Sequence, residues 1–412
     1  MEMSARRVSI VGAALSANKG AAAMVETVVA RLPEYVGPVQ FNLLTTYPSA
    51  DRERLPPHAD VRVVGLEPIR LASVEIPVAL LAFVARKLHL PLGWVRTRAS
   101  RAILDSDVVV DVAGISFADG RGVPIVVYNT LMTGLGLLLG VPTVKAAQAL
   151  GPFKGRLNHF LAMRVLPAVA MVCARGAATR AHLDTLGLKN VVDVSDLAFS
   201  LDEATHLPAD IERQLSAITG NFVTVMPSSV VKGIYEKSGG DYVEAVMRLV
   251  RSLRRETELN VVIVPHSYRI GHGEGRMNDG PVCQEVAQKC SDDDGVVGID
   301  ADLSAGELRH IVSRGSVLVT SRFHAMISGL ATATPTVVVG WSHKYKEVLS
   351  DFGLEDYGFD ARALDDSSVI VRKVQEAIAH RDSLVTQIRS GLPAVKDRSA
   401  RNFSVIADVI AK

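Results

Sequence analysis

The stretch Val317-Leu318-Val319-Thr320-Ser321-Arg322-Phe323-His324-Ala325 carries an arginine and a histidine directly out of a β-branched run. The residues before Ser321 predict a buried strand, and residues 325–333, rich in Ala, Ser and Gly, predict a helix. Open α/β sheets bind ligands at such strand ends. Helix-start N–H groups and the guanidinium of Arg322 favour an anion there, and the imidazole of His324 can move a proton near neutral pH. The alternative is a structural ion pair for Arg322 and a hydrogen-bonded core position for His324.

A second apolar run, Thr336-Val337-Val338-Val339, follows Pro335 and ends in Gly340-Trp341-Ser342-His343-Lys344. Two successive strand ends therefore deliver polar side chains. With Gly353-Leu354 added, this order resembles the C-terminal signature of the polysaccharide pyruvyl transferase family. That signature is an Arg-x-His after a strand, a Pro-led strand, an aromatic residue, a lysine and, a short helix later, a Gly-Leu.

The first half of the chain resembles the same family in short motifs. The residues are Asn18-Lys19-Gly20-Ala21 after an apolar run, the glycine-containing stretch 107–117, Gln148-Ala149-Leu150-Gly151-Pro152-Phe153, Cys173-Ala174-Arg175-Gly176 and the stretch 194–199. The order and spacing of these motifs extend the resemblance along nearly the whole chain. Two acids of the family pattern are replaced, by Ala21 and by Gly176, and the glycine-rich turn has Ala113 beside Gly114.

The resemblance implies transfer of a pyruvyl group from phosphoenolpyruvate to two hydroxyls of a sugar in a cell-surface polysaccharide or glycolipid. This reaction forms a cyclic ketal and releases phosphate. The implied partners are phosphoenolpyruvate as donor substrate and a glycan or lipid-linked sugar as acceptor, with no metal and no other cofactor. Because the donor is close to a trianion, it needs convergent cations.

The implied site divides into donor, catalytic and acceptor residues. Donor binding falls to Arg175, Arg322, Lys344 and His266, and catalysis to Arg322 with His324 as the general acid–base. Acceptor binding falls to Asn18, Gly20, Ser116 and Gln148 at strand ends of the first domain. Simpler roles stay open for several of these residues: turn capping for His266, a surface position for Lys344 and turn chemistry for the acceptor residues.

Strand-like runs alternate with helical patterns throughout, as in parallel sheets with helices on both faces. A chain of 412 residues exceeds what one core usually supports, so we expect two domains. The prediction is an α/β fold of two Rossmann-like domains facing across a cleft, GT-B-like, with residues 1–200 on the acceptor side and 210–395 on the donor side. Residues 396–412 are expected to form a helix that packs back on the first domain. The predicted strands are residues 8–12, 39–44, 61–64, 108–112, 143–147, 171–174, 191–194, 221–226, 260–264, 296–298, 317–320 and 336–339.

Composition excludes several classes of protein. With 45 basic and 44 acidic side chains, no overall field favours nucleic acid. The number and spacing of the three cysteines match neither a disulfide framework nor a Cys-x-x-Cys metal site. This pattern favours the reducing cytoplasm as the compartment. The N-terminus lacks the apolar core of a signal peptide. The oligomeric state is not predicted.

The two most apolar regions are residues 76–85 and 123–144, and both predict buried helices because charged or polar residues and glycines interrupt them. For residues 76–94 the alternative is peripheral contact with the inner face of an anionic membrane, since Arg86, Lys87 and Trp94 follow the aliphatic body.

Two other functions stay open. A GT-B glycosyltransferase would use Arg322 and Lys344 to hold the diphosphate of a nucleotide sugar. A non-catalytic glycan-binding protein would explain the missing acids at Ala21 and Gly176. The glycine-rich polar loop 268–279 is a candidate lid or acceptor loop in the enzymatic interpretations.

Overall fold

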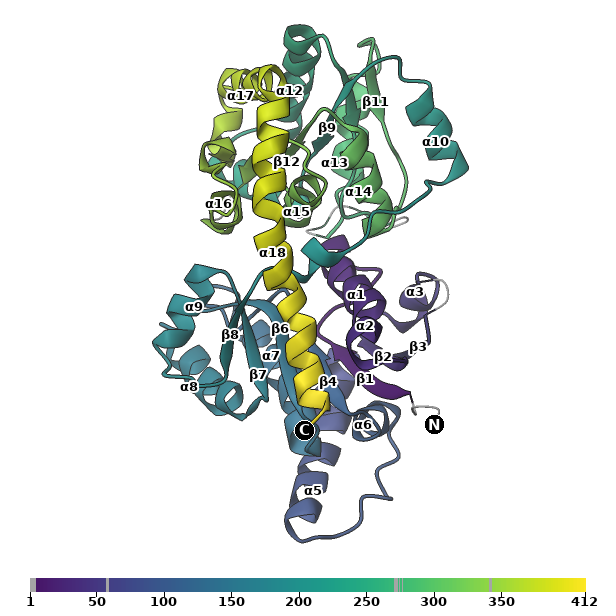
Figure 1. Cartoon of the computed structure of the whole chain (residues 1–412), viewed down its shortest axis with the longest axis vertical. Coiled ribbons are helices and arrows are strands. Elements are labelled where there is room, and N and C mark those ends of the chain that lie inside the picture. Colours follow the sequence, from purple (N-terminus) through teal and green to yellow (C-terminus); the bar gives the residue numbers. More distant parts are fainter. Residues whose placement is uncertain (1–4, 57–58, 270–272, 274, 276, 341–342) are drawn as a thin grey trace. The chain divides into compact units, whose positions relative to one another are not determined.

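The computed structural model describes residues 5–56, 59–269, 273, 275, 277–340 and 343–412. By their contacts they form two compact units (Figure 1). The first unit is Met1–Ser16, Ala21–Leu201 and Lys396–Lys412, and the second is Ala17–Gly20 and Asp202–Val395. The short segment Ala17–Gly20 therefore belongs with the second unit, although most of the helix that it opens belongs with the first.

The first unit contains a parallel sheet in the order β3-β2-β1-β4-β6-β7-β8, with β5 paired to β6 outside this path. Strand β4 begins with three valines, and every residue of β4 and β6 is buried, because helices cover both faces of the sheet. The strands are β1 (Arg6–Val11), β2 (Val39–Thr45), β3 (Val61–Gly65), β4 (Val108–Asp111), β5 (Ile115–Ser116), β6 (Thr143–Leu150), β7 (Met171–Arg175) and β8 (Val191–Val194).

The helices of this unit connect the strands as parallel pairing requires. They are α1 (Lys19–Arg31), α2 (Pro33–Val36), α3 (Pro48–Arg52), α4 (Pro68–Arg70), the π-helical turn η1 (Leu71–Glu75), α5 (Ile76–Lys87), α6 (Arg98–Leu104), α7 (Val123–Leu139), α8 (Arg156–Val165), η2 (Leu166–Ala168), α9 (Ala177–Asp184) and η3 (Leu197–Ser200). The last helix, α18 (Arg381–Ile410), begins in the second unit and ends in this one.

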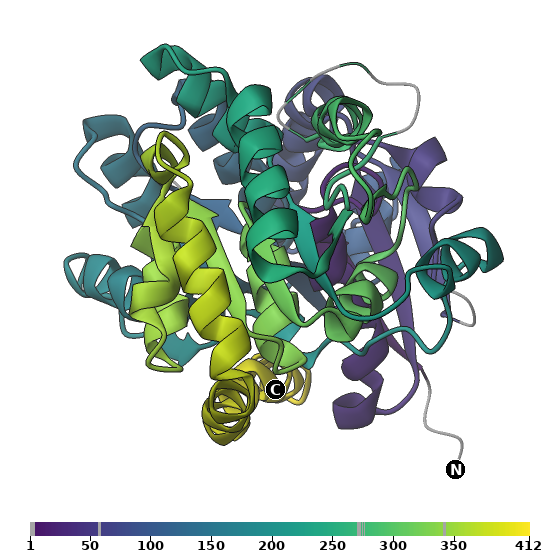
Figure 2. The ribbon, with the colours of Figure 1, turned by 90° about the horizontal axis from the view of Figure 1, so that it is seen from above.

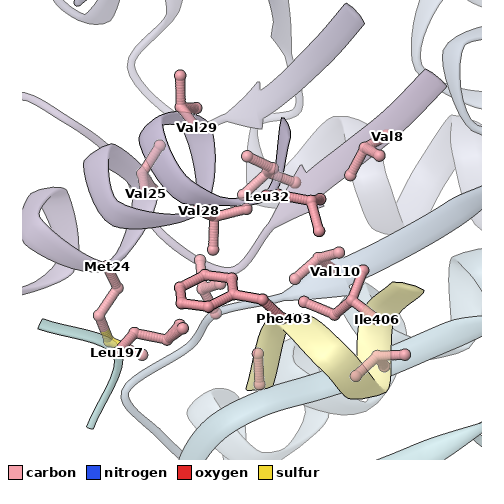
Figure 3. Close-up of a cluster of buried hydrophobic side chains, with 14 of the residues drawn as sticks. Val8, Met24, Val25, Val28, Val29, Leu32, Val110, Leu197, Phe403 and Ile406 are labelled. Atoms are coloured by element: carbon pink, nitrogen blue, oxygen red, sulfur yellow. The ribbon is translucent and has the colours of Figure 1, made fainter. Parts of the chain in front are cut away.

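Side-chain alternation along β4 separates the two faces of the first sheet. Val110 packs in a cluster with α1 and with Phe403 and Ile406 of α18, which point into it in Figure 3. Val109, the next residue, packs on the other face in a cluster with α5, α6 and α7. The period of two in a strand thus assigns α1 and the end of α18 to one layer and α5–α7 to the opposite layer.

The second unit contains a parallel sheet in the order β11-β10-β9-β12-β13-β14. Its strands are β9 (Phe222–Met226), β10 (Asn260–Ile263), β11 (Val296–Gly298), β12 (Val317–Thr320), β13 (Thr336–Gly340) and β14 (Gly358–Asp360). Helices α12 and α17 contact each other, and Figure 2 shows them side by side, α12 in teal-green and α17 in yellow-green. The helices are α10 (Ala209–Ser216), α11 (Ser229–Tyr235), η4 (Glu236–Ser238), α12 (Tyr242–Thr257), α13 (Gly280–Lys289), α14 (Ala305–Arg314), α15 (Phe323–Ala331), α16 (His343–Ser350), η5 (Glu355–Tyr357), η6 (Ala361–Leu364) and α17 (Ser368–Ala379).

The predicted strands all overlap observed ones, and the short strands β5 and β14 were not predicted. We predicted a buried helix at residues 76–85. One face of α5 is exposed to solvent, so the prediction is wrong for that face. Leu81 is 62% exposed and Val84 53%, while Ala79, Ala82 and Ala85 form the buried face. Among the described residues, one helical stretch, Pro68–Lys87, meets the length and hydropathy expected of a membrane span, with 28% of it buried.

Candidate functional site

The carboxyl ends of the second unit's strands lie at one edge of its sheet, because all the strand pairs are parallel. Polar residues follow these ends one strand after another. After β9 comes Ser229, after β10 come His266 and Ser267, after β12 come Arg322 and His324, and after β13 comes Lys344.

Asp279 is the residue that joins three of these strand ends. It is fully buried, and its carboxylate accepts hydrogen bonds from the backbone N–H of Ser229 (2.8 Å) and of Ser267 (3.0 Å). It also accepts from Nε of Arg322 (2.8 Å) and, at its other oxygen, from Nη2. Two parallel charge-assisted bonds fix the plane of a guanidinium, so Asp279 holds Arg322 in one orientation.

Arg322 is itself buried, and its Nη2 also donates to Oγ of Ser229 (3.1 Å). The alternative of a structural ion pair is therefore present in the structure. An ion pair to one carboxylate does not conflict with anion binding, because a guanidinium carries five donors in a fixed plane.

His266 lies in a cationic neighbourhood. Burial lowers the pKa of His266 well below its ordinary value, and the neighbouring Arg322, His324 and Lys19 lower it further. The imidazole is therefore neutral at physiological pH. Its Nδ1 is buried with no hydrogen-bond partner among the described residues, so the alternative in which this histidine caps a turn finds no contact through that atom.

The segment Ala17–Gly20 meets the same strand edge. A Cβ added at Gly20 would overlap the imidazole of His324, so the absence of a side chain lets the two approach. Oδ1 of Asn18 accepts from the N–H of Gly20 (2.9 Å) and lies 3.5 Å from Oγ of Ser267. The structure thus places Asn18 and Gly20, predicted on the acceptor side, beside His324 and Ser267.

Lys19, between these two residues, is buried and forms an ion pair with Asp302 at 2.5 Å. Neither residue was predicted to belong to the site. Lys19 adds positive charge to the neighbourhood of His266, while Asp302 balances part of it.

An aromatic ring contacts His324, and a second ring packs on the first. The ring of His324 makes an edge contact with Phe323, with centroids 5.3 Å apart, and Phe323 makes another with Tyr345 at 5.8 Å. The hydroxyl of Tyr345 donates to the carbonyl of Ser321 (3.1 Å), and burial raises the pKa of Tyr345 to about 12. Tyr345 is thus a neutral hydrogen-bond donor that holds the turn before α15.

Lys344 lies in the first turn of α16, after β13, which pairs with β12. Its backbone position is at the same sheet edge as Arg322. Trp341, part of the family signature, lies outside the described residues, as do parts of the loop 268–279.

The first unit contains the other predicted acceptor residues in a buried network. Oγ of Ser116 donates to Oε1 of Gln148 (2.5 Å), and Nε2 of Gln148 donates to the carbonyl (2.7 Å) and Oδ1 (2.8 Å) of Asp111. Oδ2 of Asp111 pairs with Nζ of Lys145 at 2.6 Å, and burial lowers the pKa of Lys145 against the opposing effect of Asp111. Because Ser116 and Gln148 are fully buried and bonded to each other, the structure gives them a role in holding the strand ends of this sheet.

Arg175, predicted to bind the donor, also belongs to the first unit. It pairs with Asp196 at 2.6 Å and donates to the carbonyl of Gly114 (3.0 Å). Gly176, which replaces an acid of the family pattern, has φ of +81°. A residue with a side chain is strained in that conformation, so the backbone favours glycine at this position.

Four residues of this site, Asp279, Ser229, Lys19 and Asp302, had no individual role predicted from the sequence. Asp279 does lie in the loop 268–279, which the sequence indicated as a candidate lid or acceptor loop. Lys19 was quoted in a motif but had no assigned role. Among the described residues no group of three or more His, Cys, Asp or Glu side chains could hold a metal ion.

The two Rossmann-like units define a protein of the GT-B-like class. The UDP-GlcNAc 2-epimerase of Neisseria meningitidis, solved with UDP-GlcNAc, shares this fold at a TM-score of 0.61 and 9% identity, with 97% of this chain and 99% of that chain covered. The α,α-trehalose 6-phosphate synthase of Burkholderia multivorans shares it at a TM-score of 0.54 and 11% identity, with 99% and 98% covered. Identities this low establish the fold alone.

Sequence comparison identifies the family. The profile of the polysaccharide pyruvyl transferase family matches residues 18–343. The chain belongs to this family. The amylovoran biosynthesis protein AmsJ of Erwinia amylovora is 22% identical over 318 residues, which cover 74% of this chain and 72% of that protein. The family assignment makes this chain a transferase that acts on polysaccharide.

Proposed function

We propose that this protein transfers a pyruvyl group from phosphoenolpyruvate to two hydroxyls of one sugar and releases phosphate. The observation that carries the proposal is the pair of buried cations, Arg322 and Lys19, that lie with His324 around a buried, neutral His266 and are each held by an acid. A small, highly charged anion suits such a cluster, since clustered cations hold phosphate and carboxylate groups through charge-assisted hydrogen bonds. Family membership supports the same choice of reaction.

In this proposal Arg322 binds the donor and also orders the site. Its planar fork, fixed by Asp279, presents hydrogen-bond donors at the start of α15, where backbone N–H groups also favour an anion. Lys344, at the neighbouring strand end, adds a second cation for the donor. The assignment of Arg175 to the same donor stays a prediction.

His324 is the proposed general acid–base. The first hydroxyl oxygen bonds to C2 of the donor while a proton is delivered to C3, which gives a phospho-ketal. The bond from C2 to the phosphate oxygen then breaks, and phosphate leaves with the electron pair. The second hydroxyl oxygen bonds to C2 and loses its proton, so the two hydroxyl protons end on C3 and on phosphate. A placed acid–base contributes about two to four orders of magnitude in rate.

His266 is suited to a different task. Because its pKa is lowered well below the ordinary value, it stays neutral beside a bound anion and can offer one hydrogen bond without adding charge. Asn18, whose side chain lies near Ser267, is the proposed contact for the acceptor.

Phosphate release tests the proposal. The wild-type protein is incubated with phosphoenolpyruvate and a panel of methyl hexosides with unblocked neighbouring or 1,3-related hydroxyls. We expect phosphate release that requires both partners and that falls about a hundredfold or more in His324→Gln. The matched control is His159→Gln, a substitution at an exposed position of α8, which keeps the wild-type rate.

Two results would contradict the proposal. One is release of UDP from UDP-hexoses in the same panel, which indicates glycosyl transfer. The other is no phosphate release together with no calorimetric binding of phosphoenolpyruvate, which indicates a non-catalytic glycan-binding protein.

A further inference from the structure

Helix α5 presents its larger apolar side chains to solvent. Its buried face consists of alanines, whereas Leu80, Leu81 and Val84 are 49%, 62% and 53% exposed. An amphipathic helix of a soluble unit normally buries the larger side chains. The arrangement in α5 is the reverse, so the exposed face is available to something other than the core of this unit.

The chain after α5 continues the same exposed apolar surface. Leu88 is 63% exposed, Leu90 54% and Trp94 44%. In Figure 1, α5 and the segment that follows it lie at the lower end of the first unit. We call residues 80–94 with these exposed side chains the α5 face. Several large apolar side chains exposed within one segment are typical of an interaction site.

The exposed charged side chains of residues 68–104 are all positive. Residues 68–104 contain six Arg and Lys and one acid, Glu75. Glu75 is fully buried, so its charge does not reach the surface. Lys87, Arg96 and Arg98 are exposed beside the apolar residues, and no ion pair joins them to a carboxylate among the described residues. A partner that binds this region must therefore combine an apolar interior with a negatively charged surface.

The helix is tied into the unit on its other side. Oε2 of Glu75 accepts from Oγ1 of Thr97 (2.6 Å) and from Oγ of Ser100 (2.6 Å), and Oε1 accepts from Nε of Arg70 (3.2 Å). These bonds fasten the start of α5 to the start of α6. Since Ala79 and Ala82 also pack in the core with α7, α5 cannot leave the unit to span a bilayer without breaking it.

We infer that the α5 face docks on the surface of an anionic phospholipid membrane. The helix lies along the interface, with Leu81, Val84 and Leu88 among the acyl chains. Lys87, Arg96 and Arg98 contact the headgroups, and Trp94 lies at their level, where amphipathic rings are enriched. The inference is independent of the donor site in the second unit.

Vesicle binding of the full chain tests this inference. The Trp341→Phe variant leaves Trp94 as the one tryptophan of the chain, because the sequence contains two. With vesicles of phosphatidylcholine and phosphatidylglycerol, we expect sedimentation with the lipid, a blue shift of Trp94 emission and quenching by brominated acyl chains. With phosphatidylcholine alone, binding is expected to be at least tenfold weaker.

Two sets of variants separate charge from apolar contact. The triple variant Lys87→Gln/Arg96→Gln/Arg98→Gln should weaken binding to anionic vesicles roughly a hundredfold, because the loss of each cation weakens it about fivefold. The control Arg372→Gln/Arg381→Gln/Arg389→Gln removes the same charge from exposed positions of α17 and α18 and should change binding less than about fivefold. Leu81→Ser/Val84→Ser should abolish the Trp94 shift, and Ile234→Ser, on α11, should leave it unchanged.

Three outcomes would overturn the inference. The first is equal affinity for neutral and anionic vesicles, or none for either. The second is binding with no change in Trp94, which would place another face on the lipid. The third is a lipid-free dimer that Leu81→Ser/Val84→Ser converts to monomer, which would make the α5 face a contact with a second copy.

Discussion

Asp279 holds Arg322 through both carboxylate oxygens, and the same two oxygens accept the N–H groups of Ser229 and Ser267. One buried acid therefore fixes Arg322, the arginine proposed to bind the donor, and two neighbouring strand ends. Removing the arginine alone leaves that acid buried without its counter-charge. We therefore expect substitutions in this pair to change the stability of the protein as well as the proposed activity.

We predict that Arg322→Met destabilises the protein by about 3–5 kcal/mol, because a broken buried ion pair leaves an uncompensated charge. The double variant Arg322→Met/Asp279→Asn should cost less than the sum of the two single changes. Urea unfolding of the four proteins measures this cycle. As a control, Arg255→Met breaks an exposed pair with Glu256 and should cost about 0–1 kcal/mol. A cost for Arg322→Met as small as that of the control would contradict the prediction.

Gly20→Ala tests the close approach of Gly20 to His324. The new Cβ would overlap the imidazole, so we expect His324 to move and the catalytic rate to fall about tenfold or more, as a misplaced acid–base does. Gly134→Ala, in α7, meets no atom within 4 Å and should stabilise the helix by about 0.5–1 kcal/mol without a change in rate. Equal rates for the two variants would show that Gly20 does not restrict His324.

The lowered pKa of His266 predicts a pH dependence of stability. Below about pH 6.5 the unfolded chain binds a proton at this histidine while the folded protein does not. Above that pH His266 is neutral in both states and does not lower the stability. As the pH falls from about 6.5 toward the folded-state pKa, the free energy of unfolding decreases by up to about 1.4 kcal/mol per pH unit. His266→Gln should remove this slope from urea titrations, and His159→Gln should keep it. A wild-type slope that His266→Gln does not change would refute the assignment.

The three cysteines should be unreactive in the folded protein. Burial raises the pKa of the Cys173 thiol to about 12, that of Cys290 to about 11 and that of Cys283 well above its ordinary value. The thiolate is the reactive form, so Ellman's reagent should find no fast-reacting thiol in the native protein and three after denaturation. A fast-reacting thiol under native conditions would mean that one of these regions opens.

Much of the fold follows from the sequence because strands covered on both faces need uninterrupted apolar runs. Val108-Val109-Val110 of β4 and Thr336-Val337-Val338-Val339 of β13 show this directly. Strands β5 and β14 span two and three residues, too short for any periodicity to reveal them. Their pairing depends on strands already in place.

Residues of the candidate site that directly follow strands could be predicted from the sequence. A residue that a long loop brings back to the same edge of the sheet could not. Arg322, His324 and His266 each follow a strand end, and the common edge of a parallel sheet brings them together. Asp279 comes from a loop whose path depends on the whole unit, so its pairing with Arg322 could not be read from spacing. Likewise, the apolar run of α5 predicts burial on average but does not say that alanines, rather than leucines, face the sheet.

The donor is the central claim, and isothermal titration calorimetry with phosphoenolpyruvate tests it without knowledge of the acceptor. We expect binding by the wild type and unchanged binding by Arg372→Lys. Arg322→Lys keeps the charge opposite Asp279 but not the planar fork, so its affinity should fall at least tenfold. Binding of UDP-GlcNAc but not phosphoenolpyruvate, or phosphoenolpyruvate binding that Arg322→Lys leaves unaltered, would contradict this claim.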